Sequence, residues 1–125
     1  MDDRRILDAI DTSWAHVDAL RIPLWIFCFE RRQIVWANAA ARALWDVPDN
    51  DTMRRRDLTA DMSEARVGAL YSFRERVRSG ETVTEAAVIY PRGVAKRVHL
   101  VHHHVRLPDG TDAMCTETDI EPPAE

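Results

Sequence analysis

The sequence has no hydrophobic run long enough to cross a membrane, and no hydrophobic signal core at its start. Crossing a bilayer takes roughly 20 apolar residues, and no apolar stretch in these 125 residues approaches that length. Met1 is followed by Asp-Asp-Arg-Arg, which argues against secretion. A chain of this length holds one core and is too short for two. We therefore expect a single cytoplasmic domain without a membrane segment.

Glycine and cysteine are both scarce, with four and two residues. No glycine-rich phosphate loop is present, so the chain lacks the nucleotide-handling motif of a kinase or a cyclase. Neither a Gly-x-Ser-x-Gly elbow nor a His-Glu-x-x-His helix occurs, and we expect no enzyme. Cys28 and Cys115 lack a metal or redox spacing and are expected to be buried thiols.

Positive charge is not concentrated in any one region, and the net charge is -4. The basic residues are nearly all arginine, spread among acids. The one basic cluster is Arg54-Arg55-Arg56, and it is surrounded by aspartates at positions 49, 51, 57 and 61. No nucleic-acid-binding footprint is visible.

The first segment, Asp3–Leu20, has the pattern of an amphipathic helix. Its apolar residues follow the spacing of a coiled-coil seam, widened by Ile6 and Leu20, and are Leu7, Ile10, Trp14 and Val17. Such a short helix is not stable alone in water. Its apolar face must cover this domain's own sheet, the same helix of a second copy, or both.

Two short apolar runs follow, Leu24–Phe29 and Gln33–Ala37. The first has no polar residue on either face before Glu30, which predicts a central strand covered on both sides. Asn is among the strongest helix N-caps. Asn38 therefore predicts the end of the second strand and the start of a helix over Ala39–Trp45.

The middle of the chain is expected to be helical. A short helix is predicted over Met53–Ala60. Asp61-Met62-Ser63-Glu64 has the pattern of a capping box, so a longer helix is predicted to start at Asp61 and run to about Arg78. Ser79-Gly80 supplies its stop.

The last third has the pattern of a three-stranded meander. Pro- and Gly-containing turns separate three runs, which are Thr82–Tyr90, Ala95–Leu107 and Asp112–Thr118. The order is thus two strands, helices and three strands, which predicts an α+β layer architecture.

The segment Ile34-Val35-Trp36-Ala37-Asn38-Ala39-Ala40 resembles the "I-x-W/Y-x-N-x-A" segment of PAS domains. Gly80-Glu81, Leu107-Pro108-Asp109-Gly110 and Thr118-Asp119-Ile120 resemble further PAS features. The resemblance implies a five-stranded antiparallel sheet with helices on one face over residues 22–120. Residues 1–21 would be an N-terminal flanking helix, and 121–125 a linker.

PAS domains are sensory and regulatory modules of signalling proteins. The resemblance implies a bacterial signal-transduction module, a homodimer joined through the flanking helix, and a downstream histidine kinase or diguanylate cyclase domain that this chain does not contain. If the module senses a small ligand, the candidate lining residues are Ile26, Trp36, Leu44, Val67, Leu70, Phe73 and Ile89, which would otherwise simply fill the core. The alternative is a ligand-free dimerisation module. Polar groups converging on a cavity would favour the sensor, and a dry core would favour the alternative.

Four histidines lie in one predicted strand, at His99, His102, His103 and His104. Alternation places His102 and His104 on one face and the other two on the opposite face. Two His at i and i+2 can share a metal, but a stable site needs more ligands. No acidic partner is identifiable, so we expect no metal site and a partly exposed strand face, which could respond to pH. A Glu/His acid–base pair formed by Glu85 or Glu117 stays an open alternative.

Two PAS cofactors can be tested by their attachment residues. Flavin-binding LOV domains carry a reactive Cys on a middle helix, and haem-binding PAS domains supply a His from the long helix or near it. Residues 46–78 contain neither Cys nor His. We therefore do not expect covalent flavin or haem, and the ligand stays unknown.

Overall fold

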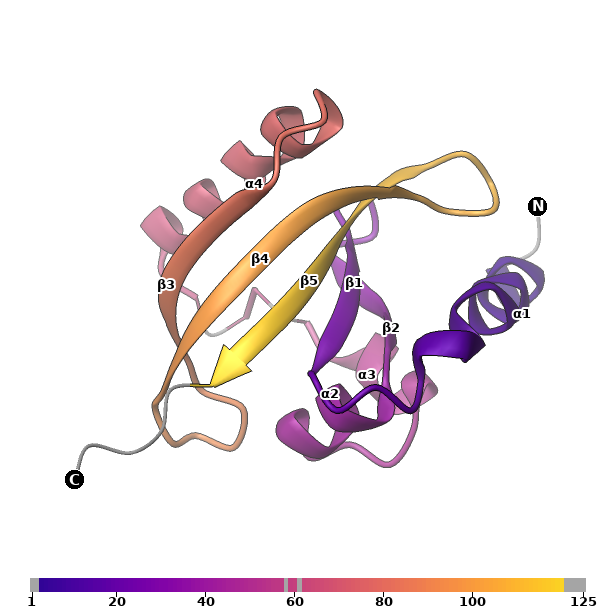
Figure 1. The fold of residues 1–125 in the computed structure, drawn as a ribbon, viewed down its shortest axis with the longest axis horizontal. Coiled ribbons are helices and arrows are strands. Elements are labelled where there is room, and N and C mark those ends of the chain that lie inside the picture. Colours follow the sequence, from indigo (N-terminus) through magenta and orange to yellow (C-terminus); the bar gives the residue numbers. More distant parts are fainter. Residues whose placement is uncertain (1–2, 58, 61, 121–125) are drawn as a thin grey trace.

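Five antiparallel strands form one sheet, with three helices on one face and one on the other (Figure 1). The computed structural model describes residues 3–57, 59–60 and 62–120. The elements in chain order are α1 (Asp3–Trp14), a 3₁₀ turn η1 (Ala15–Val17), β1 (Leu24–Cys28), β2 (Gln33–Ala37), α2 (Ala39–Trp45), α3 (Asn50–Arg55), α4 (Glu64–Arg78), β3 (Val83–Ile89), β4 (Lys96–Arg106) and β5 (Asp112–Ile120).

The strand order across the sheet is β2-β1-β5-β4-β3. The predicted five-stranded antiparallel α+β architecture is therefore confirmed. β1 lies between β2 and β5, and all five of its residues are buried. Its position is the one expected for a strand with no polar residue on either face.

Two apolar clusters lie on the two faces of the sheet. The inner cluster packs between the sheet and the helices α2, α3 and α4, and includes Trp25, Phe27 and Leu70. The outer cluster packs between the sheet and α1, and includes Ile26 and Trp36. Successive residues of β1 alternate between the clusters, as the pleat of a strand requires.

A β-bulge at Val35 interrupts this regular alternation of faces in β2. Ile26 pairs with Trp36 but Phe27 pairs with Ile34, so Val35 has no partner in the ladder. Val35 and Trp36 consequently both join the outer cluster. The freed carbonyl of Val35 accepts a hydrogen bond of 2.7 Å from Nε of Arg54 on α3. The buried arginine thus holds α3 against β2.

The α1 helix is shorter than the pattern predicts, because it ends at Trp14 and continues as a 3₁₀ turn to Val17 rather than as a helix to Leu20. The chain turns here to enter β1, and Asn38 Nδ2 donates to the Val17 and Ile22 carbonyls, at 3.4 and 2.9 Å. Ile10 is fully buried in the outer cluster. The other three seam residues, Leu7, Trp14 and Val17, pack against that cluster. The apolar face of α1 therefore covers this chain's own sheet.

The helix caps combine confirmed and corrected predictions. Asn38 caps α2 as predicted, and its Oδ1 accepts from the Ala41 amide at 2.9 Å. The helix α3 covers Asn50–Arg55 rather than Met53–Ala60, because Asp49 caps it by accepting from the Thr52 amide at 2.7 Å. Ser63 caps α4, so that helix starts after position 63; the cap predicted at Asp61 lies outside the described residues.

Within the described residues, no helix combines the length and the apolar character that crossing a membrane requires.

Candidate functional site: a cavity beside the inner face of the sheet

A cavity of about 550 Å³ opens between the end of β3 and the helical layer. Its other walls come from β2, the end of α2, the helix α3, the segment leading into α4 and the first turn of α4. The lining residues are Ile34, Trp45, Met53, Arg56, Asp57, Met62, Ser63, Arg66, Val88, Ile89 and Tyr90. Its volume lies within the range of small-molecule sites, roughly 300–1,000 Å³.

One wall of the cavity is apolar. Ile34 and Met53 are buried members of the inner cluster, and Met62 and Ile89 are partly buried against it. Methionine side chains are unbranched and fill irregular spaces easily. This wall can therefore adapt its shape to an apolar group.

The charged side chains of the lining are mostly positive. Arg56 and Arg66 line the cavity, and so does Ser63, the N-cap of α4. The N-terminus of a helix carries partial positive charge. Asp57 is the one carboxylate in the lining, and its Oδ1 accepts from the Thr59 amide and hydroxyl at 2.9 and 2.7 Å.

Trp45 joins the apolar and polar parts of the lining. Its side chain is 8% exposed and packs edge-on against Trp25, with ring centroids 5.6 Å apart. Its indole N–H is buried and has no hydrogen-bond acceptor among the described residues. Arg56 lies over the same ring, 5.7 Å from its centroid, and donates to the Trp45 carbonyl at 2.7 Å. A buried donor without an acceptor costs free energy of folding, and the indole N–H of Trp45 is such a donor.

A chain of polar contacts runs from the cavity across three strands. Arg66 binds Glu85 on β3 through two hydrogen bonds, of 2.7 and 3.1 Å. Glu85 Oε2 lies 2.6 Å from Nε2 of His102 on β4, and Nδ1 of His102 lies 2.8 Å from the Thr116 hydroxyl on β5. A carboxylate only accepts, so Nε2 donates here; in the neutral ring, Nδ1 accepts from the Thr116 hydroxyl.

The charge of Glu85 is stabilised by its partners. Burial raises the pKa of this carboxyl, but hydrogen bonds from His102 and Arg66 outweigh burial and lower the pKa to about 2. His102 is 2% exposed and stacks on Phe73 of α4, with ring centroids 5.1 Å apart. Glu85 therefore stays ionised near neutral pH, which makes it a poor general base. Of the two carboxylates considered for an acid–base pair, Glu85 contacts a strand histidine, His102.

The predicted pocket residues do not form one lining. Only Ile89 lines the cavity. Leu44, Leu70 and Phe73 belong to the inner cluster or pack against it, and Val67 is half-buried on α4. Ile26 and Trp36 lie in the outer cluster, beneath α1 and on the opposite face of the sheet. The prediction is corrected for these two, because their positions in β1 and in the bulged β2 point them away from α2–α4.

The histidine strand is less exposed than predicted. His102 is buried against Glu85, and Nε2 of His104 lies 2.7 Å from Oδ1 of Asp112. Each of these two thus has the acidic partner that the sequence did not reveal. In the part of the chain that the structure describes, no three His, Cys, Asp or Glu side chains come together as a metal-binding group.

Both cysteines are buried in the outer cluster, as predicted for buried thiols. They lie on the sheet face opposite the cavity, beneath α1. Burial and the charge of Glu117 raise the pKa of the Cys115 thiol to about 12. Neither thiol is therefore placed to bond a group held in the cavity.

Sequence reasoning missed most of the polar lining. Arg56 appears in the sequence only as part of an arginine cluster, and Arg66 as one of several arginines on α4. One signal for Glu85 was available, because it shares a strand face with Val83, Ala87 and Ile89. A carboxylate at a core-facing position implies a buried partner.

No protein-family model matches this sequence, and no curated protein matches it. Solved structures do match. The PAS domain of nitrogen regulation protein NR(II) from Vibrio parahaemolyticus superposes with a TM-score of 0.67 at 13% identity, covering 87% of this chain and 97% of that chain.

Two further solved structures have a similar fold. A domain of a sensory box sensor histidine kinase/response regulator from Geobacter sulfurreducens has a TM-score of 0.62 at 18% identity, covering 88% of this chain and 94% of its own. The PAS domain of Bordetella pertussis BvgS has a TM-score of 0.66 at 12% identity, covering 93% of this chain and 88% of its own. From its sheet order to its helical layer, this chain has the fold of a PAS domain.

Proposed function

We propose that this protein is a sensory module that binds a small ligand in the cavity beside β3 and regulates an output domain outside this chain. The single observation that carries the proposal is the cavity itself, about 550 Å³ in volume, with an adaptable apolar wall and converging polar groups. Such convergence is the feature that separates a ligand site from a packed core.

The similar structures support the same kind of role. They include domains of sensor histidine kinases. By this analogy the output domain is a histidine kinase or a diguanylate cyclase, and the module works in the bacterial cytoplasm. The analogy is one of fold, and the residues that would carry the function are this chain's own.

The polar chain from Arg66 to Thr116 supplies a route for the signal. A ligand that attracts Arg66 competes with Glu85 for the guanidinium. Glu85 then changes its contact with His102, whose other nitrogen lies against Thr116 on β5. β5 is the last strand and ends at Ile120. A change in the cavity is thereby transmitted to the strand nearest the C-terminal end of the fold.

Native mass spectrometry of protein purified from cells tests the ligand. We expect extra mass on the folded protein that is lost on denaturation, with a released metabolite. The variant Ile89→Trp fills the cavity and should lose the extra mass. Thr84→Trp, on the outward side of the same strand, should keep it. Equal loss in both variants, or a bare chain in all samples at high metabolite concentration, contradicts the proposal.

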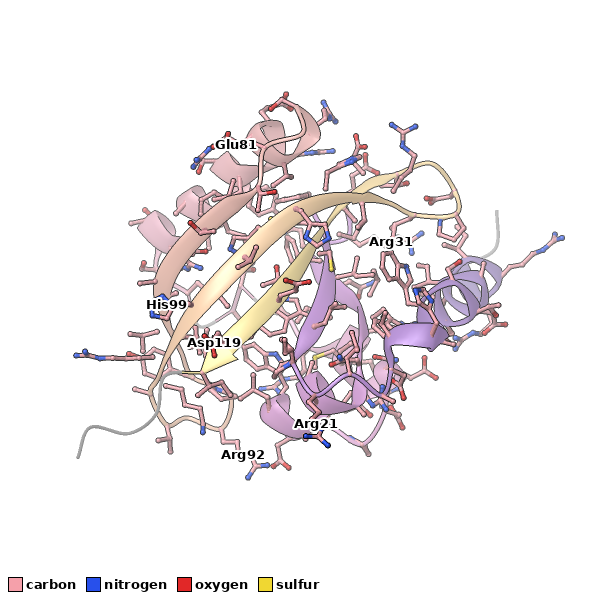
Figure 2. The ribbon with its side chains drawn as sticks, viewed as in Figure 1. Arg21, Arg31, Glu81, Arg92, His99 and Asp119 are labelled. Atoms are coloured by element: carbon pink, nitrogen blue, oxygen red, sulfur yellow. The ribbon has the colours of Figure 1, made fainter. Side chains whose placement is uncertain are left out.

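A second candidate function is dimerisation without a ligand. α1 packs near β2 and leaves the outer face of β3 and β4 open (Figure 1). His99 and Asp119, which face each other across the β4–β5 ladder and are labelled in Figure 2, are exposed there, as are Thr84 and Ala86. The same patch on a second copy would form an isologous contact, which joins a homodimer without using α1.

Analytical ultracentrifugation tests the dimer. If the open outer face is the contact, Ala86→Asp should convert a dimer to a monomer, while Ala65→Asp on the exposed side of α4 should leave it unchanged. A dimer that survives Ala86→Asp, or a monomer at all concentrations, argues against this candidate.

A further inference from the structure

Among the described residues, the charged groups that line the cavity are not all paired. Arg66 is neutralised by Glu85 through a bidentate ion pair. Asp57 is already engaged, because Thr59 donates two hydrogen bonds to its carboxylate. Arg56 has no carboxylate partner among the described residues, and only one of its guanidinium nitrogens is used, by the Trp45 carbonyl.

Besides the paired Arg66, two positive features therefore line the cavity: the charge of Arg56, which has no carboxylate partner among the described residues, and the N-terminus of α4 at Ser63. A planar guanidinium presents several donors that match a carboxylate. Helix N-termini also favour anions. Trp45 adds its aromatic ring to the same lining, beneath Arg56.

Other side chains of the lining cannot bind a polar group. Ile34, Met53, Met62 and Ile89 offer no hydrogen-bonding group beyond thioether sulfur. Met62 and Ile89 are only partly buried, so an apolar ligand body that covers them removes apolar surface from water.

We infer that the cavity binds an amphipathic organic carboxylate, with its carboxylate at Arg56 and its apolar body against the two methionines. This inference rests on the proposed ligand-binding function and names the class of ligand. The carboxylate lies next to the Arg66–Glu85 pair, so binding weakens that pair and acts on His102.

Three probes of equal chain length separate charge from apolar burial: octanoate, neutral octanamide and cationic octylammonium. We expect the whole chain to bind octanoate about tenfold more tightly than octanamide, the difference that one charged hydrogen bond supplies, and octylammonium more weakly still. Isothermal titration calorimetry measures the three dissociation constants.

Two arginines on neighbouring positions provide a matched pair of variants. Arg56→Gln should abolish the preference for octanoate over octanamide. Arg55→Gln removes an equal charge from an exposed side chain that contacts Thr52 and does not line the cavity, and should leave the preference unchanged. Circular dichroism checks that both variants keep the fold.

The indole N–H resonances locate the bound probe. Octanoate should shift the resonance of Trp45, which lines the cavity, and leave that of Trp36, on the opposite face, in place. Assignment follows from Trp45→Phe and Trp36→Phe.

Equal binding of octanoate and octanamide overturns the inference while leaving a ligand-binding function standing. If Arg55→Gln and Arg56→Gln lose the preference for octanoate equally, the assignment of the carboxylate to Arg56 is wrong. A shift of the Trp36 resonance instead of the Trp45 resonance would likewise overturn the binding site. Absence of binding by all three probes also overturns it, and the release of a different metabolite in the mass-spectrometric experiment would then still support the sensor.

Discussion

His102 and Glu85 form a buried contact of 2.6 Å, Nε2 to Oε2, that joins β4 to β3 beneath the helix α4. The two residues are not direct ladder partners, because His102 pairs with Val83 and Glu85 with Leu100. The contact is therefore diagonal, and it takes the position that an apolar pair would occupy in an ordinary sheet. Arg66 completes it from α4.

The stability of the fold should depend on the charge of Glu85 in acid. Its pKa is lowered from 4.5 to about 2 in the folded protein. A lowered carboxyl pKa adds stability that is complete above the unfolded value and is lost as the pH falls through the folded value. We expect the free energy of unfolding to fall by about 2 kcal/mol between these two values, after a discount for partial solvent screening.

Urea titrations between pH 2 and pH 7 measure this effect. In Glu85→Gln the acid-dependent loss should shrink by that amount. Glu117→Gln, which removes an exposed carboxylate from β5, should retain it. Identical pH profiles for the wild type and Glu85→Gln would show that the contact is not a charged one.

Asn38 should contribute more than an ordinary helix cap. Its Oδ1 accepts from the amides of Ala41 and Leu24 at 2.9 and 3.0 Å, and its Nδ2 donates to the Ile22 carbonyl at 2.9 Å. Asn38→Ala leaves these groups buried without partners. We expect a loss of about 3 kcal/mol in the free energy of unfolding.

The exposed cap of α3 is the comparison for Asn38. Asp49→Ala should cost only about 1 kcal/mol, because the freed amide of Thr52 can bond to water. Equal losses in the two variants would mean that the additional contacts of Asn38 carry no net stability. Chemical denaturation monitored by tryptophan fluorescence measures both.

Ile10 should stabilise the single chain rather than an interface between copies. Its side chain is 0% exposed in the outer cluster. Ile10→Ala creates a cavity there and should cost about 3 kcal/mol. Leu20→Ala, at an exposed position, should be close to neutral.

Protein concentration distinguishes the two possible roles of α1, as a cover for its own sheet or as a contact between two copies. If α1 covers only its own sheet, the unfolding midpoint of Ile10→Ala should not change across a hundredfold range of concentration, a range wide enough to expose mass action. A midpoint that rises with concentration in the wild type and not in the variant would place α1 in a dimer contact instead.

The two thiols should report on the docking of α1. Cys28 and Cys115 are both buried in the outer cluster, and burial with the nearby Glu117 charge raises the Cys115 pKa to about 12. The thiolate is the reactive form, so Cys115 should not react with iodoacetamide at neutral pH while the protein is folded, and burial should shield Cys28 from the reagent. Labelling followed by mass spectrometry should be slow in the wild type and faster in Ile10→Ala. Rapid labelling of the folded wild type would contradict the burial of these thiols.

The pattern of the sequence alone determined the strands, the order of the elements and the cap at Asn38. These features depend on neighbours in the chain: the alternation of apolar residues, the turn residues Pro and Gly, and the hydrogen-bonding reach of an Asn side chain. For the same reason the sequence placed β1 in the interior of the sheet, between two other strands, because its apolar run leaves no face for water.

The tertiary structure decided which face each side chain occupies and which charges meet. The bulge at Val35 moved Trp36 to the outer cluster, and a one-residue irregularity of this kind has no periodic signal in the sequence. Arg66, Glu85 and His102 are far apart in the chain, and their contacts exist only because α4 crosses β3 and β4. The cavity, with an Arg56 that has no carboxylate partner among the described residues, follows from the packing of five separate segments, which local pattern does not encode.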